Sequence, residues 1–175
     1  AHNVAQKSGA VHLGFVDEEA CTWYLPTTKN QREHTIHLSK FALTQFAELR
    51  ELREADPVTR KPLAWVFPNS HGTGPVCVKS FGKQLADRQR QEDERLANRT
   101  KAVSSLALKG GRWTAHDLRR TASTVMSQLG ISDDVINECL NHIKQGMSGI
   151  YIQDRRQAEQ ARAFDALGAR LSAIA

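Results

Sequence analysis

The sequence TAHDLRRTASTVMSQLGISDDVINECLNH, residues 114–142, decides how the chain folds. Its apolar residues recur every three or four positions, which is typical of amphipathic helices. Thr114 followed three residues later by Asp117 predicts a capping box at the start of one helix. Gly130 predicts the end of that helix, which we therefore place at about residues 115–129.

Each of the two predicted helices is expected to bury one apolar face. In the first helix this stripe comprises Leu118, Ala122, Val125 and Leu129. Ser132 is predicted to cap a second, shorter helix. Its buried positions are expected to be Val135, Ile136, Cys139 and Leu140.

The polar residues of this region suit chemistry on a phosphate. His116 and Arg119 stand three residues apart and so share one face in the first turn of the predicted helix. His142 and Tyr151 follow. Arginine offers a planar fork of donors for phosphate oxygens, histidine transfers protons near neutral pH, and a deprotonated phenol is a nucleophile.

Three motifs together resemble one family. The run HDLRRT (residues 116–121), then Leu140-Asn141-His142, then Tyr151 nine residues later, is similar to the tyrosine recombinases, or phage integrases. These motifs most resemble those of integrases from prophages and genomic islands. The resemblance extends over residues 14–171. It implies the catalytic domain of a DNA breaking and rejoining enzyme, occupying residues 1–175.

The resemblance also implies a role for each candidate residue. Tyr151 would attack a DNA phosphodiester and form a 3′-phosphotyrosine. Arg119 and His142 would hold the non-bridging oxygens, and His116 would assist proton transfer or orient the phosphate. Lys29, within Thr28-Lys29-Asn30, matches a lysine on a family β-hairpin and would protonate the leaving 5′ oxygen. No cofactor, ATP or metal is expected, because the protein–DNA ester conserves the bond energy.

Further contacts with DNA are expected from Arg112, Arg120 and Lys29. For Arg120 the alternative is a salt bridge, and for Lys29 it is a solvated turn lysine. The family has one more catalytic arginine upstream of the hairpin lysine, whereas here no arginine precedes Arg32. We expect truncation at the N-terminal edge, with the N-terminal DNA-binding domains also absent. Loss of one phosphate clamp costs about 3 kcal/mol or more in the transition state, so the fragment can be inactive while its parent is active.

The N-terminal part of the chain predicts a small antiparallel sheet. Short strands are expected at residues 11–16, 21–25 and 33–38, followed by a helix capped by Ser39. Another helix is predicted from Pro75 onward, with its apolar face at Val78, Phe81 and Leu85. The charged stretch at residues 87–101 reads either as the exposed end of that helix or as a mobile insertion. Residues 143–148 are expected to be flexible and the last helix to begin at Asp154. The fold is therefore mixed, mainly α with a small antiparallel β-sheet.

The composition narrows the class of protein and its location. The chain has 175 residues, 40% of them hydrophobic and 25% charged, which is typical of a soluble globular domain. No apolar run is long enough for a membrane span, and three cysteines suit reduced thiols in the cytoplasm. The net charge of +5 suits a polyanion but is also common on ordinary surfaces.

The expected partner is a duplex DNA attachment site, bound by a homo-oligomer, a tetramer in this family, with accessory DNA-bending proteins in some systems. Bacterial cytoplasm and nucleoid are the expected location. Three alternatives stay open: a non-catalytic helix-turn-helix module, relaxation of DNA by type IB topoisomerase chemistry, and a zinc-stabilised interaction domain. The sequence does not distinguish integration from excision.

Overall fold

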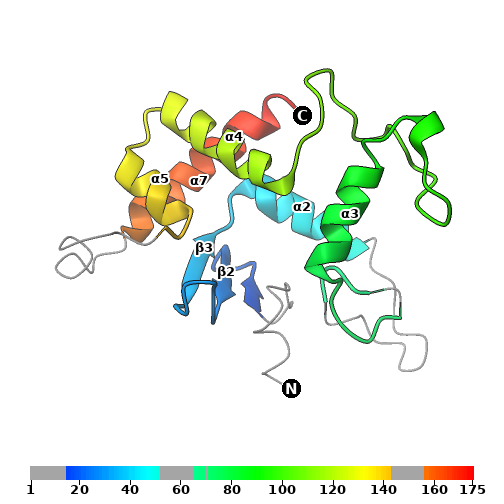
Figure 1. Cartoon of the computed structure of the whole chain (residues 1–175). Coiled ribbons are helices and arrows are strands. Elements are labelled where there is room, and N and C mark those ends of the chain that lie inside the picture. The colour runs from blue at the N-terminus through cyan, green and yellow to red at the C-terminus, as the bar shows by residue number, and fades with distance from the viewer. Residues whose placement is uncertain (1–14, 52–64, 70, 143–155) are drawn as a thin grey trace.

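The computed structural model describes residues 15–51, 65–69, 71–142 and 156–175. A small antiparallel sheet lies beside a group of helices (Figure 1). In chain order the elements are β1 (Val16–Asp17), β2 (Thr22–Leu25), β3 (His34–His37), α2 (Lys40–Glu51), α3 (Val78–Asp87), the 3-10 helix η2 (Glu92–Glu94), α4 (Ala115–Gln128), α5 (Asp133–Cys139) and α7 (Gln157–Ser172). The prediction of a mainly helical domain with a small antiparallel sheet is confirmed.

The sheet has the order β1-β2-β3 and its strands pair with their neighbours along the chain. Trp23 is central, because it pairs with Val16 on one side and with Ile36 on the other. Its ring also meets Phe46 of α2 edge to face, with ring centroids 6.5 Å apart. Large aromatic contacts of this kind hold a sheet that would be too small to be stable alone.

Helices α4 and α5 end with the same backbone motif. After α4, Gly130 is left-handed at φ 80° and the Ile131 N–H reaches back to the Met126 carbonyl at 3.1 Å. After α5, Asn141 is left-handed at φ 53° and the His142 N–H reaches the Asn137 carbonyl at 2.9 Å. These are Schellman motifs, in which glycine, and less often asparagine, adopts the left-handed position. The predicted stop at Gly130 is confirmed.

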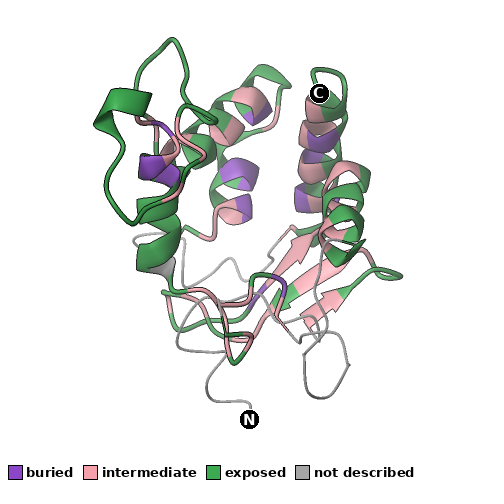
Figure 2. Cartoon of the chain, turned by 90° about the vertical axis from the view of Figure 1, so that its right-hand side faces the viewer, coloured by how far each residue is buried: buried purple, intermediate pink, exposed green. Residues whose placement is uncertain are grey.

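The core forms where α4, α5 and α7 meet. Its buried members are Met126, Val135, Ile136, Cys139 and Ala163. Figure 2 shows buried residues on the facing sides of these helices. Helix α7 also packs against α2 and β3, where His37 Nε2 lies 3.0 Å from a carboxylate oxygen of Asp165. The last helix thus joins the helical pair to the sheet.

Two positions of the predicted apolar stripe on α4 are wrong. Leu118 is 55% exposed and Leu129 is 42% exposed, whereas Met126 is the fully buried residue of this helix. The packing contact of α4 is concentrated in its second half, so the first turn lies outside the core. The face of α3 is likewise mispredicted at Phe81, which is 51% exposed, while Leu85 is buried.

The charged stretch is not the exposed end of a helix, and its mobility as an insertion stays a prediction. Helix α3 ends at Asp87, and η2 follows. The buried carboxylate of Asp87 holds Arg90 at 3.4 Å and Arg99 at 3.1 Å. These two ion pairs fold the segment back onto the end of α3.

Three cysteines, at 21, 77 and 139, are unpaired, as predicted. In the described part of the chain, no helix combines the length and the apolar character that a membrane crossing requires. The predicted start of the last helix at Asp154 and the predicted flexibility of residues 143–148 lie outside the described residues.

Candidate active site

The first turn of α4 is fixed by its own capping box. The Asp117 carboxylate accepts hydrogen bonds from the Thr114 N–H at 2.9 Å and from the Thr114 hydroxyl at 2.8 Å. These bonds lower the pKa of Asp117, and the charge of Arg120, 3.5 Å away, acts in the same direction. The predicted capping box is confirmed, and Arg120 takes the salt bridge that was its alternative role.

Arg119 points from this turn toward the end of α5. Its guanidinium donates a hydrogen bond to the carbonyl oxygen of Leu140, the C-cap residue of α5. His116 lies one turn earlier on the same helix and is exposed. One donor of the Arg119 fork is thus used to hold α5, and the guanidinium has further donors for a ligand.

His142 follows α5 by three residues and its ring is also held. Its Nδ1 lies 2.9 Å from the side-chain oxygen of Asn137. With the amide oxygen as acceptor, Nδ1 carries a hydrogen, and Nε2 is the nitrogen left for a ligand. Donation from Nε2 to a phosphate oxygen then requires the protonated ring.

The turn that carries Lys29 packs against the end of α5, next to His142. The Asn30 side chain donates to the Asn141 carbonyl at 2.7 Å, and the Asn141 side chain donates to the Thr28 hydroxyl at 3.0 Å. Lys29 stands between these two contacts in sequence and is exposed. The β2–β3 turn is therefore fastened to the end of α5, more than a hundred residues away in the chain.

Three consecutive residues, Leu140 to His142, form a junction between three parts of the molecule. Leu140 binds Arg119 of α4, Asn141 binds the turn of Lys29, and His142 binds α5 itself. Four of the predicted catalytic residues thus lie on parts of the chain that are bonded to one another or directly joined: Lys29, His116, Arg119 and His142. Tyr151, the fifth, lies outside the described residues.

The sequence did not assign the residues that make the junction. Thr28, Asn30 and Asn141 lie inside the sequence motifs but have no predicted role, and no motif includes Asn137. The signal for Asn141 is its place one residue beyond the C-cap of a helix, where a side chain in the left-handed conformation projects away from the helix. Its partner on the turn could not be deduced from local sequence.

A zinc-stabilised domain, one of the alternatives above, would have to draw its ligands from residues such as His71, Cys77, Cys139 and His142. Throughout residues 15–51, 65–69, 71–142 and 156–175, no group of three or more His, Cys, Asp or Glu side chains is placed to hold a metal ion. Cys139 lies in the core, where burial and then the charge of Glu138 raise the pKa of its thiol to about 11. This thiol stays protonated at neutral pH and acts as a small apolar core residue.

A sequence model described as the phage integrase family matches residues 10–158, a range that includes the Lys29 turn, α4, α5 and Tyr151. The chain belongs to the phage integrase family. Searches of curated proteins and of solved structures returned no significant match. The family acts by site-specific recombination of DNA, with cleavage and joining of the tyrosine recombinase type.

In this phage integrase domain the approach to α4 is held by Gln89. Its side-chain amide donates to the Trp113 carbonyl at 2.8 Å and accepts from the Trp113 N–H at 2.8 Å. The Gln89 side chain is buried, so this reciprocal pair fixes the backbone one residue before the N-cap of α4. The start of the helix that carries His116 and Arg119 is therefore set by a residue near the end of α3.

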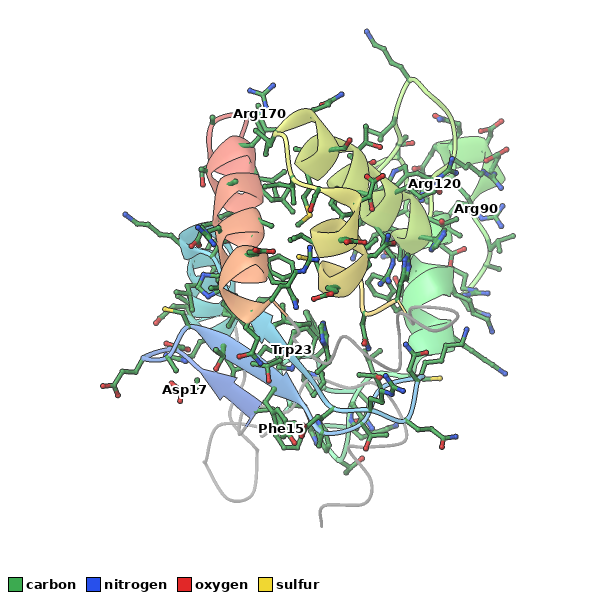
Figure 3. All side chains as sticks on the ribbon, turned by 90° about the vertical axis from the view of Figure 1, so that its left-hand side faces the viewer. Phe15, Asp17, Trp23, Arg90, Arg120 and Arg170 are labelled. Carbon is green, nitrogen blue, oxygen red and sulfur yellow. The ribbon has the colours of Figure 1, made fainter. Side chains whose placement is uncertain are left out.

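Arg112, a predicted DNA contact of this integrase domain, forms an exposed ion pair with Glu94 at 3.1 Å. Arg120 is similarly exposed, with 74% of its side chain accessible. Figure 3 shows Arg120 near the start of α4, on the side of the charged loop that carries Arg90. Exposed ion pairs of this kind contribute little to stability and exchange readily for phosphate. Both arginines stay predictions as DNA contacts.

Proposed function

We propose that this chain is the catalytic domain of a recombinase that integrates or excises a prophage or genomic island, by cutting and rejoining its DNA attachment site through Tyr151. The junction at Leu140–His142 is the observation that supports this best. It links the turn of a lysine, the helix of an arginine and a histidine, which are three chemical groups that a phosphodiester exchange needs.

The proposed first step forms a bond from the Tyr151 oxygen to phosphorus and breaks the bond from phosphorus to the 5′ oxygen. The phenol proton passes to solvent or to His116, and the leaving oxygen takes a proton from the Lys29 ammonium. Reversal by the 5′ hydroxyl of another strand restores the phosphodiester and frees Tyr151. No external energy source is required, because the number of ester bonds stays constant.

Charge on the non-bridging oxygens builds up as phosphorus becomes five-coordinate. The Arg119 guanidinium can hold two of these oxygens, and the protonated His142 ring can hold a further one through Nε2. Removal of one such donor costs about 3 kcal/mol, or roughly a hundredfold in rate. The substrate is DNA, so we place the protein in the bacterial cytoplasm with the nucleoid, acting as a tetramer on two DNA sites.

The test is a covalent protein–DNA complex. The protein in its longest native form first selects duplexes from a randomised pool. Selected duplexes are then nicked so that the cleaved end diffuses away, and the mixture is run on a denaturing gel without metal ions. We expect a covalent band that disappears in Tyr151→Phe, with an unchanged amount of bound DNA.

Bound DNA without a band on any selected duplex contradicts the proposal and favours a non-catalytic binding module. Where a band forms, two linear attachment sites distinguish the outcomes. Exchange of DNA arms supports recombination, whereas relaxation of supercoiled plasmid without exchange supports topoisomerase chemistry.

A further inference from the structure

Asn141 does more than end a helix. The same position after α4 is taken by Gly130, which suffices for a left-handed residue in a Schellman motif. An asparagine at this position after α5 retains the backbone conformation and adds a side chain. That side chain reaches the Thr28 hydroxyl at 3.0 Å, across 113 residues of sequence.

The Thr28 hydroxyl is oriented by other hydrogen bonds of the turn. Its hydroxyl donates to the Arg32 carbonyl at 2.9 Å, and its oxygen accepts from the Asn141 side chain at 3.0 Å and, more weakly, from the Asn30 N–H at 3.4 Å. The backbone of Thr28 also bonds to Arg32, at 3.0 Å, and to Gln31, at 2.9 Å. The acceptor is therefore held rigidly within the turn.

A second bond runs in the opposite direction. Asn30 donates to the Asn141 carbonyl at 2.7 Å, so the residues on both sides of Lys29 are attached to the same asparagine. Asn30 and Thr28 are half-buried, whereas Lys29 is exposed. The arrangement fixes the backbone on either side of Lys29 and leaves its side chain available to DNA.

We propose that Asn141 is a positioning residue: its side-chain bond to Thr28 holds the β2–β3 turn against the end of α5 and thereby places the Lys29 ammonium at the leaving 5′ oxygen. This inference rests on the proposed function, in which Lys29 is the acid. It adds a residue that acts only through Lys29.

The test compares two leaving groups. Nicked duplexes from the binding selection are made with an ordinary phosphodiester at the cleaved position and with a sulfur in place of the bridging 5′ oxygen. A thiol is far more acidic than an alcohol, so the sulfur leaves as a thiolate and needs no proton from an acid. Loss of a correctly placed acid slows the first substrate and not the second.

Asn141→Gly is the decisive variant. Glycine adopts the left-handed conformation and preserves the carbonyl that Asn30 binds, so only the side-chain bond is lost. General acids contribute about 10²–10⁴-fold, and we expect cleavage of the ordinary duplex to fall by about tenfold or more. Cleavage of the sulfur duplex should stay within about threefold of the unmodified protein. In a Lys29→Ala background, Asn141→Gly should add no further loss.

Two further variants serve as controls. Thr28→Ser preserves the hydroxyl and should retain activity, whereas Thr28→Val should repeat the effect of Asn141→Gly. Asn98 is also left-handed, at φ 59°, and exposed in the charged loop. Asn98→Gly makes the same chemical change away from the junction and should leave both rates unchanged.

Each result bears on the inference. Equal slowing of both substrates by Asn141→Gly, or no slowing of either, overturns it. Failure of the sulfur duplex to rescue Lys29→Ala removes Lys29 as the acid and overturns the inference with it, while the covalent band still supports the proposed function. Absence of a band from the unmodified protein on both duplexes overturns the proposed function itself.

Discussion

Asp117 shows how a single residue can limit what a helix end binds. A helix N-terminus attracts anions, because its first N–H groups are unpaired and carry partial positive charge. In α4 the Thr114 side chain and the Asp117 carboxylate already satisfy donors at this end. The capping box engages two of the donors at this end, so we expect a phosphate near α4 to depend more on side chains such as Arg119.

The capping box also predicts a pH dependence. Bonds from Thr114 lower the pKa of Asp117 from its usual 3.8, so ionised Asp117 stabilises the fold at neutral pH. This contribution is present above the usual pKa and is lost as pH falls through the lower folded pKa. Asp117→Asn should therefore reduce the free energy of unfolding at pH 7 and have a smaller effect near pH 3. Urea unfolding of both proteins across this range measures it.

Thr114→Ala is the matched variant, because it removes the side-chain bond that lowers the Asp117 pKa most. Loss of an N-cap side chain costs about 1 kcal/mol, and Thr114→Ser should restore it. If Asp117→Asn lowers the free energy of unfolding by the same amount at pH 7 and at pH 3, the stabilising role of ionised Asp117 is contradicted.

At the scale of elements, α3 and α4 are joined by one side chain. The Gln89 side chain bonds to both the N–H and the carbonyl of Trp113, as the backbone of a neighbouring strand would do in a sheet. Gln89→Ala leaves the N–H and the carbonyl of Trp113 without these partners, at a cost of about 2 kcal/mol. Denaturant midpoints should show this loss. The exposed Gln128→Ala should change stability by less than about 0.5 kcal/mol.

Gln89→Ala should also slow formation of the covalent DNA complex, because it releases the backbone before His116 and Arg119. Equal stability of Gln89→Ala and Gln128→Ala contradicts this account of the link between α3 and α4.

Local signals in the sequence predicted the elements well, and contacts between distant residues explain the failures. The capping box at Thr114, the stop at Gly130 and the buried residues of α5 depend on neighbours within one turn. Leu118 was expected inside because a periodic stripe does not say where along a helix the packing partner lies. The candidate site residues were predicted from motif order, whereas the bonds of Asn141 join segments that no local pattern connects.

At the scale of the whole molecule, α7 holds the layers together through a close approach. Gly168 is buried where α7 passes the start of α2. A Cβ at this position would lie 2.7 Å from the Ser39 Cβ and nearer still to its hydroxyl. Only a residue without a side chain allows the two segments to pack at this distance.

Gly168→Ala should therefore destabilise the domain by about 1–3 kcal/mol, as overpacked cores do. Gly82 in α3 is the control, since nothing lies within 4 Å of a Cβ built there. Gly82→Ala should stabilise by about 0.5–1 kcal/mol. Thermal unfolding compares them, and Ser39→Gly should partly rescue Gly168→Ala. Equal effects of the two alanines contradict the packing argument.

The place of α7 in the core has a consequence during synthesis. Ala163 is fully buried against residues made some thirty positions earlier, and the same helix contacts β3 and α2. A ribosome that has released α4 and α5 but not yet α7 therefore carries a chain whose core is open. Helix α5, whose end carries the three-way junction, packs on α7, so we expect the junction to reach its final order only after α7 has emerged.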